Sequence, residues 1–133
     1  MKKIIKFLLI AMSAISLLGT TGCTTLADAR MAEGTGVKQI YQKDFDSVWK
    51  VSISSLNSLG LAIASENKGD GYILAQRGMS AFSYGENVAV FIKKRSEKET
   101  SVEIVSKRAL ATNVFAPDWT ADIFSRISMQ VNK

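Results

Sequence analysis

The chain has 133 residues, enough for a leader and one domain, and a formal net charge of +5 at pH 7. It contains no histidine and one cysteine, which excludes histidine-dependent nucleophile systems, the commonest metal ligand and an internal disulfide. Because Lys2, Lys3 and Lys6 precede Cys23 and every acidic residue follows it, residues 23–133 carry 14 basic and 12 acidic side chains. The remaining charge of +2 argues against a nucleic-acid partner.

Residues 2–23 have the layout of a secretory signal, with the sequence KKIIKFLLIAMSAISLLGTTGC. A basic start precedes an apolar run from Phe7 to Leu18, and small residues then lead to Cys23. The apolar run is about a dozen residues long, whereas a membrane span needs about 20. We therefore predict a signal peptide over residues 1–22, with Cys23 as the first residue of the mature protein.

The residues before Cys23 resemble the box of bacterial lipoprotein signals. Gly22 and Cys23 match that box, Thr21 is small, and Thr20 stands where leucine is usual. The resemblance implies that Cys23 carries lipid of the palmitate type, and two or more acyl chains would attach the protein firmly to a membrane. Thr24 rather than aspartate follows the cysteine, which in enterobacteria-like sorting implies the outer membrane, facing the periplasm, rather than the inner membrane. The alternative is an ordinary signal peptide that leaves Cys23 as a free thiol.

The next segment lacks a sustained apolar period. Residues 24–36 read TTLADARMAEGTG, which is small, polar and punctuated by glycine. We predict that residues 23–36 form the lipidated N-terminus and a flexible tether, and that residues 37–133 form a single domain.

The domain is predicted to begin with a strand and a helix. Residues 37–42 favour a short strand, and Asp44 is placed to cap a helix that ends at Gly60. Apolar residues recur through this helix at spacings of three and four. They are Phe45, Val48, Trp49, Ile53, Leu56 and Leu59.

Two hairpins and a second helix are expected to follow. Residues 61–66 and 72–77 flank a turn that contains two glycines, and residues 86–95 and 100–107 alternate apolar and polar side chains around a polar turn. Residues 108–116 either extend the last strand or form a loop. Pro117 and Asp118 then open a final helix. The order β-α-β-β-β-β-α predicts an α+β fold, with an antiparallel sheet of four to five strands and two helices packed on one face.

Three runs of sequence resemble small bacterial lipoproteins of unassigned function and, more distantly, single BamC-type domains. They follow an aromatic-x-x-Val-Trp helix, a Leu-Gly turn and a Gly-x-Ile strand: residues 45–49 (FDSVW), 56–61 (LNSLGL) and 67–73 (NKGDGYI). BamC is a lipoprotein of the outer-membrane assembly machine. The resemblance covers Val37 to Lys133 and implies the same fold, but the matching positions carry over no catalytic residue.

One loop is a candidate contact site. Met79, Phe82 and Tyr84 lie between glycines and are not required by a strand period. They form either an exposed apolar cluster for a partner or lipid, or a cluster in which Phe82 folds back over the sheet edge. Trp49 and Trp119, by contrast, lie on apolar stripes and are expected to pack in the core.

The charged candidates have plainer interpretations. Residues 93–95 with Lys98 interleave with Glu97 and Glu99, as in a solvated hairpin tip rather than a lipid-headgroup site. Asp118 and Asp122 are expected to complement the helix dipole. Asp70 belongs to a glycine turn and supplies too few ligands for calcium.

These patterns favour a non-enzymatic protein of the bacterial cell envelope. We expect no cofactor, no metal and no catalytic residues. We expect the protein to be attached to a membrane through lipid on Cys23 and to have an envelope protein as partner. The predicted role is a structural or accessory protein-interaction module. The alternative is a binding module for a small apolar or lipid-like ligand between the sheet and the helices. A hydrolase would need a Ser-Lys arrangement, and no local motif marks one.

Overall fold

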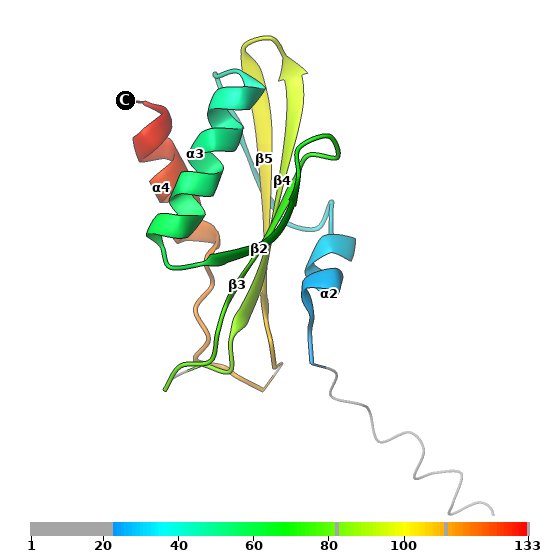
Figure 1. Cartoon of the computed structure of the whole chain (residues 1–133), viewed down its shortest axis with the longest axis vertical. Coiled ribbons are helices and arrows are strands. Elements are labelled where there is room, and N and C mark those ends of the chain that lie inside the picture. The colour runs from blue at the N-terminus through cyan, green and yellow to red at the C-terminus, as the bar shows by residue number, and fades with distance from the viewer. Residues whose placement is uncertain (1–22, 82, 111, 133) are drawn as a thin grey trace, which may run out of the picture.

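The computed structural model describes residues 23–81, 83–110 and 112–132, so the predicted signal peptide over residues 1–22 lies outside the described residues. These described residues form three helices and five strands in chain order (Figure 1). They are α2 (Leu26–Met31), β1 (Val37–Tyr41), α3 (Phe45–Ser58), β2 (Ala62–Asn67), β3 (Tyr72–Arg77), β4 (Glu86–Ser96), β5 (Glu99–Arg108) and α4 (Thr120–Val131).

The five strands form one antiparallel sheet in the order β1-β5-β4-β3-β2. This confirms the predicted α+β class and both hairpins. The β4–β5 hairpin is the longest and occupies the middle of the sheet, because its alternating apolar residues can be buried on both faces. The first strand completes the sheet by pairing with β5 rather than with a sequence neighbour.

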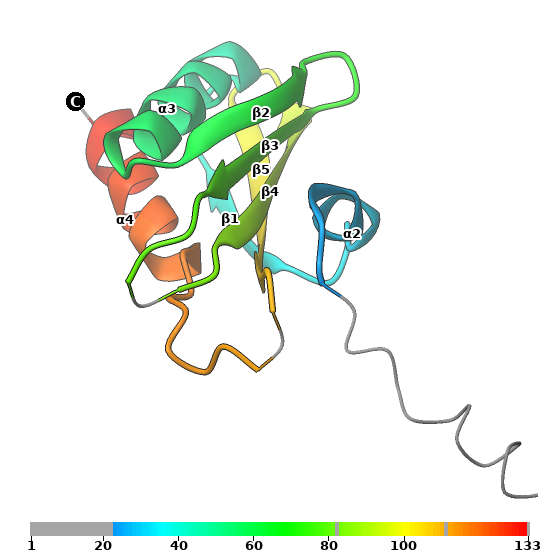
Figure 2. The same cartoon turned by 60° about the horizontal axis from the view of Figure 1, so that its bottom comes forward.

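Helices α3 and α4 cover one face of the sheet, as predicted (Figures 1 and 2). Asp44 caps α3 by accepting a hydrogen bond from the backbone N–H of Ser47 at 2.9 Å, and Gly60 ends the helix with a φ of +75°. Trp49 and Trp119 are both buried in this core. The described residues between Arg108 and Thr120 form a connection rather than more strand, and α4 begins at Thr120.

The opposite face of the sheet corrects the tether prediction. Residues 26–31 form α2, which packs on β3, β4 and β5 and buries Ala29 completely (Figure 2). The segment is folded because this face presents apolar side chains that need cover. They are Leu74, Ala89, Phe91 and Val105. A helix of six residues is too short to show an apolar period, so composition alone indicated a loop.

Candidate functional site

Cys23 is exposed, and the residue after it is fixed to one end of the sheet. The backbone N–H of Thr24 donates to the carbonyl of Ala109 at 2.9 Å, and its hydroxyl donates to the carbonyl of Arg108. The side-chain amide of Asn87 donates to the carbonyl of Thr24 at 2.8 Å. Asn87 is near the start of β4, and Arg108 ends β5. Cys23 therefore lies at the end of this hairpin farthest from its turn.

A capping box stabilises the start of α2. The backbone N–H of Thr25 donates to the Asp28 carboxylate at 2.6 Å, and the Thr25 hydroxyl accepts from the Asp28 N–H at 3.3 Å. The hydrogen bonds from the backbone and side chain of Thr25 lower the pKa of Asp28 below its ordinary value. The helix thus begins only three residues after Cys23, at Leu26.

A buried carboxylate holds the end of the same segment. Glu103 of β5 accepts hydrogen bonds from the backbone N–H groups of Gly34 and Gly36 at 2.6 and 2.8 Å, and it pairs with Lys38 at 3.4 Å. At Gly36 an added Cβ would lie 2.3 Å from the carbonyl oxygen of Ile104, so only glycine fits against the strand. Residues 24–36 are consequently attached to the sheet at both ends.

Two loops meet at the sheet end that carries Cys23 (Figures 1 and 2). The β3–β4 loop, residues 78–85, and the β5–α4 loop, residues 109–119, are joined where the N–H of Ala109 donates to the carbonyl of Gly85 at 2.9 Å. Figure 2 shows both loops at the end where the chain enters the domain, with the β4–β5 turn at the opposite end in Figure 1.

A buried polar cluster lies beneath these loops. Glu86 accepts hydrogen bonds from the Ser83 hydroxyl and from the indole N–H of Trp119, the latter at 3.3 Å. Ser83 in turn accepts from the side-chain amide of Asn113 at 3.1 Å. All four residues are buried. This network fixes the two loops against each other. It could not be predicted from local sequence patterns, because its members are up to 36 residues apart.

Among their described residues, the loops expose four large apolar side chains, which we call the loop patch. Their exposed fractions are 79% for Met79, 61% for Tyr84, 67% for Val114 and 84% for Phe115. Met79, Tyr84 and Phe115 also line one open hollow. Sequence reasoning found Met79 and Tyr84 but missed Val114 and Phe115, although residues 109–117 contain no charge to keep them in solvent.

The remaining candidate residues from the sequence have local roles or lie outside the described residues. Phe82 is not among the described residues. Three cations of β4 are paired with carboxylates: Lys93 with Glu33, Lys94 with Glu97 and Arg95 with Glu99. Lys93 is also the main reason that the pKa of Glu33 is lowered, by donating a hydrogen bond to its carboxylate. Asp118 accepts from the N–H of Thr120, and Asp70 closes a turn with Asn67.

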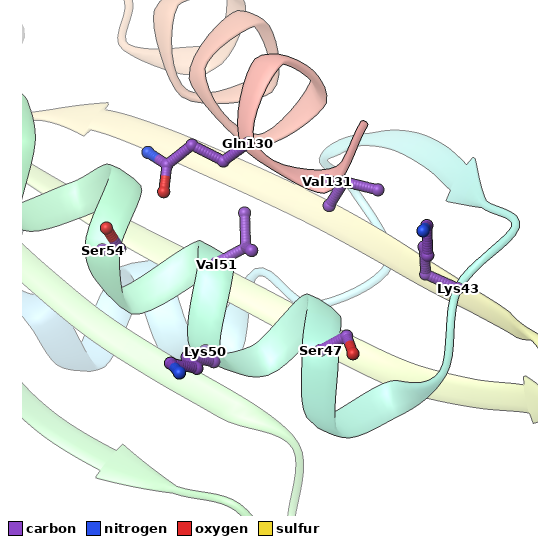
Figure 3. Close-up of a pocket in the computed structure, with 7 residues that line it drawn as sticks. All are labelled: Lys43, Ser47, Lys50, Val51, Ser54, Gln130 and Val131. Atoms are coloured by element: carbon purple, nitrogen blue, oxygen red, sulfur yellow. The ribbon is translucent and has the colours of Figure 1, made fainter. Parts of the chain in front are cut away.

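A second hollow lies between α3 and α4 (Figure 3). It has a volume of about 330 Å³, and Val51 points from α3 toward α4, where Gln130 and Val131 lie. The other lining residues are Lys43, Ser47, Lys50 and Ser54. This open groove lies at the surface between the two helices. The ligand site was instead expected between the sheet and the helices, a space that the core side chains occupy.

Neither protein-family models nor curated proteins give a match to this chain. Within residues 23–81, 83–110 and 112–132, no helix combines the length and hydropathy needed to cross a membrane. The same described part has no group of three or more Cys, Asp or Glu side chains arranged to hold a metal ion.

Proposed function

We propose that the protein is a lipoprotein of the bacterial cell envelope, anchored through lipid on Cys23, whose domain is a non-enzymatic structural or accessory module for protein contacts. The observation that carries the proposal is the exposed position of Cys23, directly after a sequence that resembles a lipoprotein signal and directly before the folded domain. An exposed cysteine at this position can carry lipid without disturbing the core. The outer membrane, facing the periplasm, is the proposed location.

The use of the buried carboxylates supports a structural role for the domain. Glu103 accepts hydrogen bonds from backbone N–H groups, and Glu86 accepts from a hydroxyl and an indole. Both carboxylates join segments that are distant in the sequence, which is a role in fold stability rather than in acid–base chemistry.

The alternative function, binding of a small apolar or lipid-like ligand, is supported at one place. The hollow between the two loops has a volume of about 410 Å³, and Met79, Tyr84 and Phe115 contribute to its lining. Extraction of the purified protein with organic solvent, followed by mass spectrometry, tests this alternative. A stoichiometric lipid other than the one on the N-terminal peptide would support it.

The proposed function is tested on the full-length protein expressed with its signal. We expect the N-terminal peptide to start at Cys23 with the added mass of acyl chains, and a pull-down in mild detergent to recover envelope proteins in stoichiometric amount. Cys23→Ala should lose both results. An unmodified Cys23, or specific catalytic turnover that a point mutation abolishes, would contradict the proposal.

A further inference from the structure

We infer that the loop patch inserts into the surface of the same lipid bilayer that holds the anchor, so that the domain is docked on the membrane in one orientation. The inference rests on the proposed lipidation of Cys23 and specifies what the domain does next to that anchor. It concerns Met79, Tyr84, Val114 and Phe115, which are exposed on the two loops at this end of the sheet.

The position of Cys23 brings the bilayer to these loops. Adjacent Cα atoms are about 3.8 Å apart, and Thr24 is hydrogen-bonded to Arg108 and Ala109. Ala109 is itself bonded to Gly85 at the end of the other loop. A lipid on Cys23 would therefore enter the membrane beside Gly85 and Ala109, where the two loops of the patch meet. Residues 24–36 cannot act as a flexible spacer between the lipid and the domain, because α2 and Glu103 hold them on the sheet.

The composition of the loops suits a lipid interface. Residues 78–85 and 109–117 contain no charged side chain, so partial insertion would desolvate no ion. The patch contains phenylalanine, methionine and valine for the acyl region and a tyrosine for the headgroup level. Large exposed apolar side chains gathered on neighbouring loops are typical of a membrane or protein contact, and the proposed anchor makes the membrane the occupant that is always present.

Basic residues flank the two loops, at the level where lipid headgroups would lie if the loop patch were inserted. Arg77 precedes the first loop, and Lys107 and Arg108 precede the second. The guanidinium group of Arg77 lies 5.0 Å from the ring centroid of Trp119, which orients it beside the loops. Anionic headgroups attract basic side chains placed just outside the apolar region. Glu86 is buried, and Asp118 is engaged at the start of α4.

The support beneath the loops lowers the entropic cost of insertion. Ser83, Glu86, Asn113 and Trp119 form the buried polar cluster that joins the loop bases. The exposed side chains are thus presented on a preformed platform rather than on independent chains.

The test uses full-length protein, purified from membranes and reconstituted into vesicles of phosphatidylethanolamine and phosphatidylglycerol. Met79→Cys and Phe115→Cys each receive an environment-sensitive fluorophore, and nitroxide-labelled lipids serve as quenchers. Met129→Cys is the matched control, because Met129 is also an exposed apolar residue. Met129 lies far from the loop patch, near the β4–β5 turn. Its neighbours Gln130 and Val131 line the same groove as Lys43. The Lys43 carbonyl accepts a hydrogen bond from Thr100, which lies beside that turn.

We expect blue-shifted emission and strong quenching at positions 79 and 115, and neither at position 129. Equal, water-like emission at all three positions would overturn the inference. Protection of positions 79 and 115 only after addition of envelope protein would also overturn it, in favour of a protein interface.

The parent chain, with no added cysteine, separates the two proposals. If lipid occupies the Cys23 sulfur, the parent protein takes up no fluorophore, and a failure of quenching then counts against the docked orientation alone. If the parent protein is labelled, Cys23 is a free thiol, and both the proposed function and this inference fail.

Discussion

At the scale of single residues, the stability of the N-terminal segment depends on hydrogen bonds that cross the molecule. Glu103 is the clearest case, because one carboxylate oxygen accepts from both Gly34 and Gly36. Its other oxygen pairs with Lys38, whose side chain is largely exposed. The backbone bonds should therefore contribute more than the ion pair, which solvent screens.

Glu103→Ala should lower the free energy of unfolding by about 3 kcal/mol, because two backbone N–H groups lose their acceptor. Glu103→Gln keeps an acceptor oxygen and should cost about 1 kcal/mol. Urea denaturation of both variants measures the difference. Equal losses for the two variants would show that the charge, rather than the hydrogen bonds, is what matters.

Asp28 should make the stability of the protein depend on pH under acidic conditions. Its pKa is lowered in the folded state by hydrogen bonds from Thr25, so its stabilising contribution is complete above the unfolded pKa of about 3.9 and disappears as the pH falls through the folded value. Asp44, whose pKa the Ser47 N–H lowers, acts in the same direction. Urea denaturation at several pH values below about 5 should show a shallower pH dependence for Asp28→Asn. An unchanged dependence would contradict this role.

At the scale of secondary-structure elements, the two sides of the sheet differ in how far the sequence could predict them. The β4–β5 hairpin and α3 could be predicted because each repeats an apolar period over several residue pairs or turns. Helix α2 could not be predicted in this way, because it has six residues and buries only Ala29 completely against the sheet, with partly buried neighbours. Its capping box, Thr25 with Asp28, was the available signal.

The docking of α2 can be tested by one substitution at two positions. Ala29→Asp places a charge against Leu74, Ala89 and Phe91 and should destabilise the protein by about 3 kcal/mol. Ala27→Asp is the control, because Ala27 is exposed on the same helix and the change should cost less than about 1 kcal/mol. Thermal denaturation compares them. Equal melting temperatures for the two variants would mean that α2 is not held on the sheet in solution.

The candidate site shows the same limit of sequence reasoning. Cys23, Met79 and Tyr84 could be selected because each stands out in its local sequence. Phe115 could not be connected with Met79, because their proximity depends on the β5–α4 loop folding beside the β3–β4 loop. That arrangement is fixed by the cluster around Ser83 and Glu86, whose partners Asn113 and Trp119 are remote in the chain.

At the scale of the whole molecule, the two ends of the sheet carry different features. Cys23 and the loop patch lie at one end, and the β4–β5 turn lies at the other (Figure 1). Ten residues of β5 span about 33 Å. In the docked orientation that we propose, the turn would stand roughly that far from the lipid surface.

This height is measurable by energy transfer. A donor on Lys98→Cys, in the β4–β5 turn, and an acceptor lipid in the bilayer should report a separation of about 30 Å, whereas a donor on Phe115→Cys should report near contact. A short, similar distance for both donors would indicate that the domain lies flat on the membrane.

The hydrogen bonds of Thr24 also have a consequence for the order of events during biogenesis. On the proposed function, an enzyme must bind the backbone on both sides of Cys23 in order to process it. The N–H and carbonyl of Thr24 are already occupied in the folded domain, by Ala109 and Asn87. Residues 108 and 109 come late in the chain, so processing has to be finished before β5 accepts the N-terminal segment. Folding of the domain would then itself prevent any later processing at Cys23.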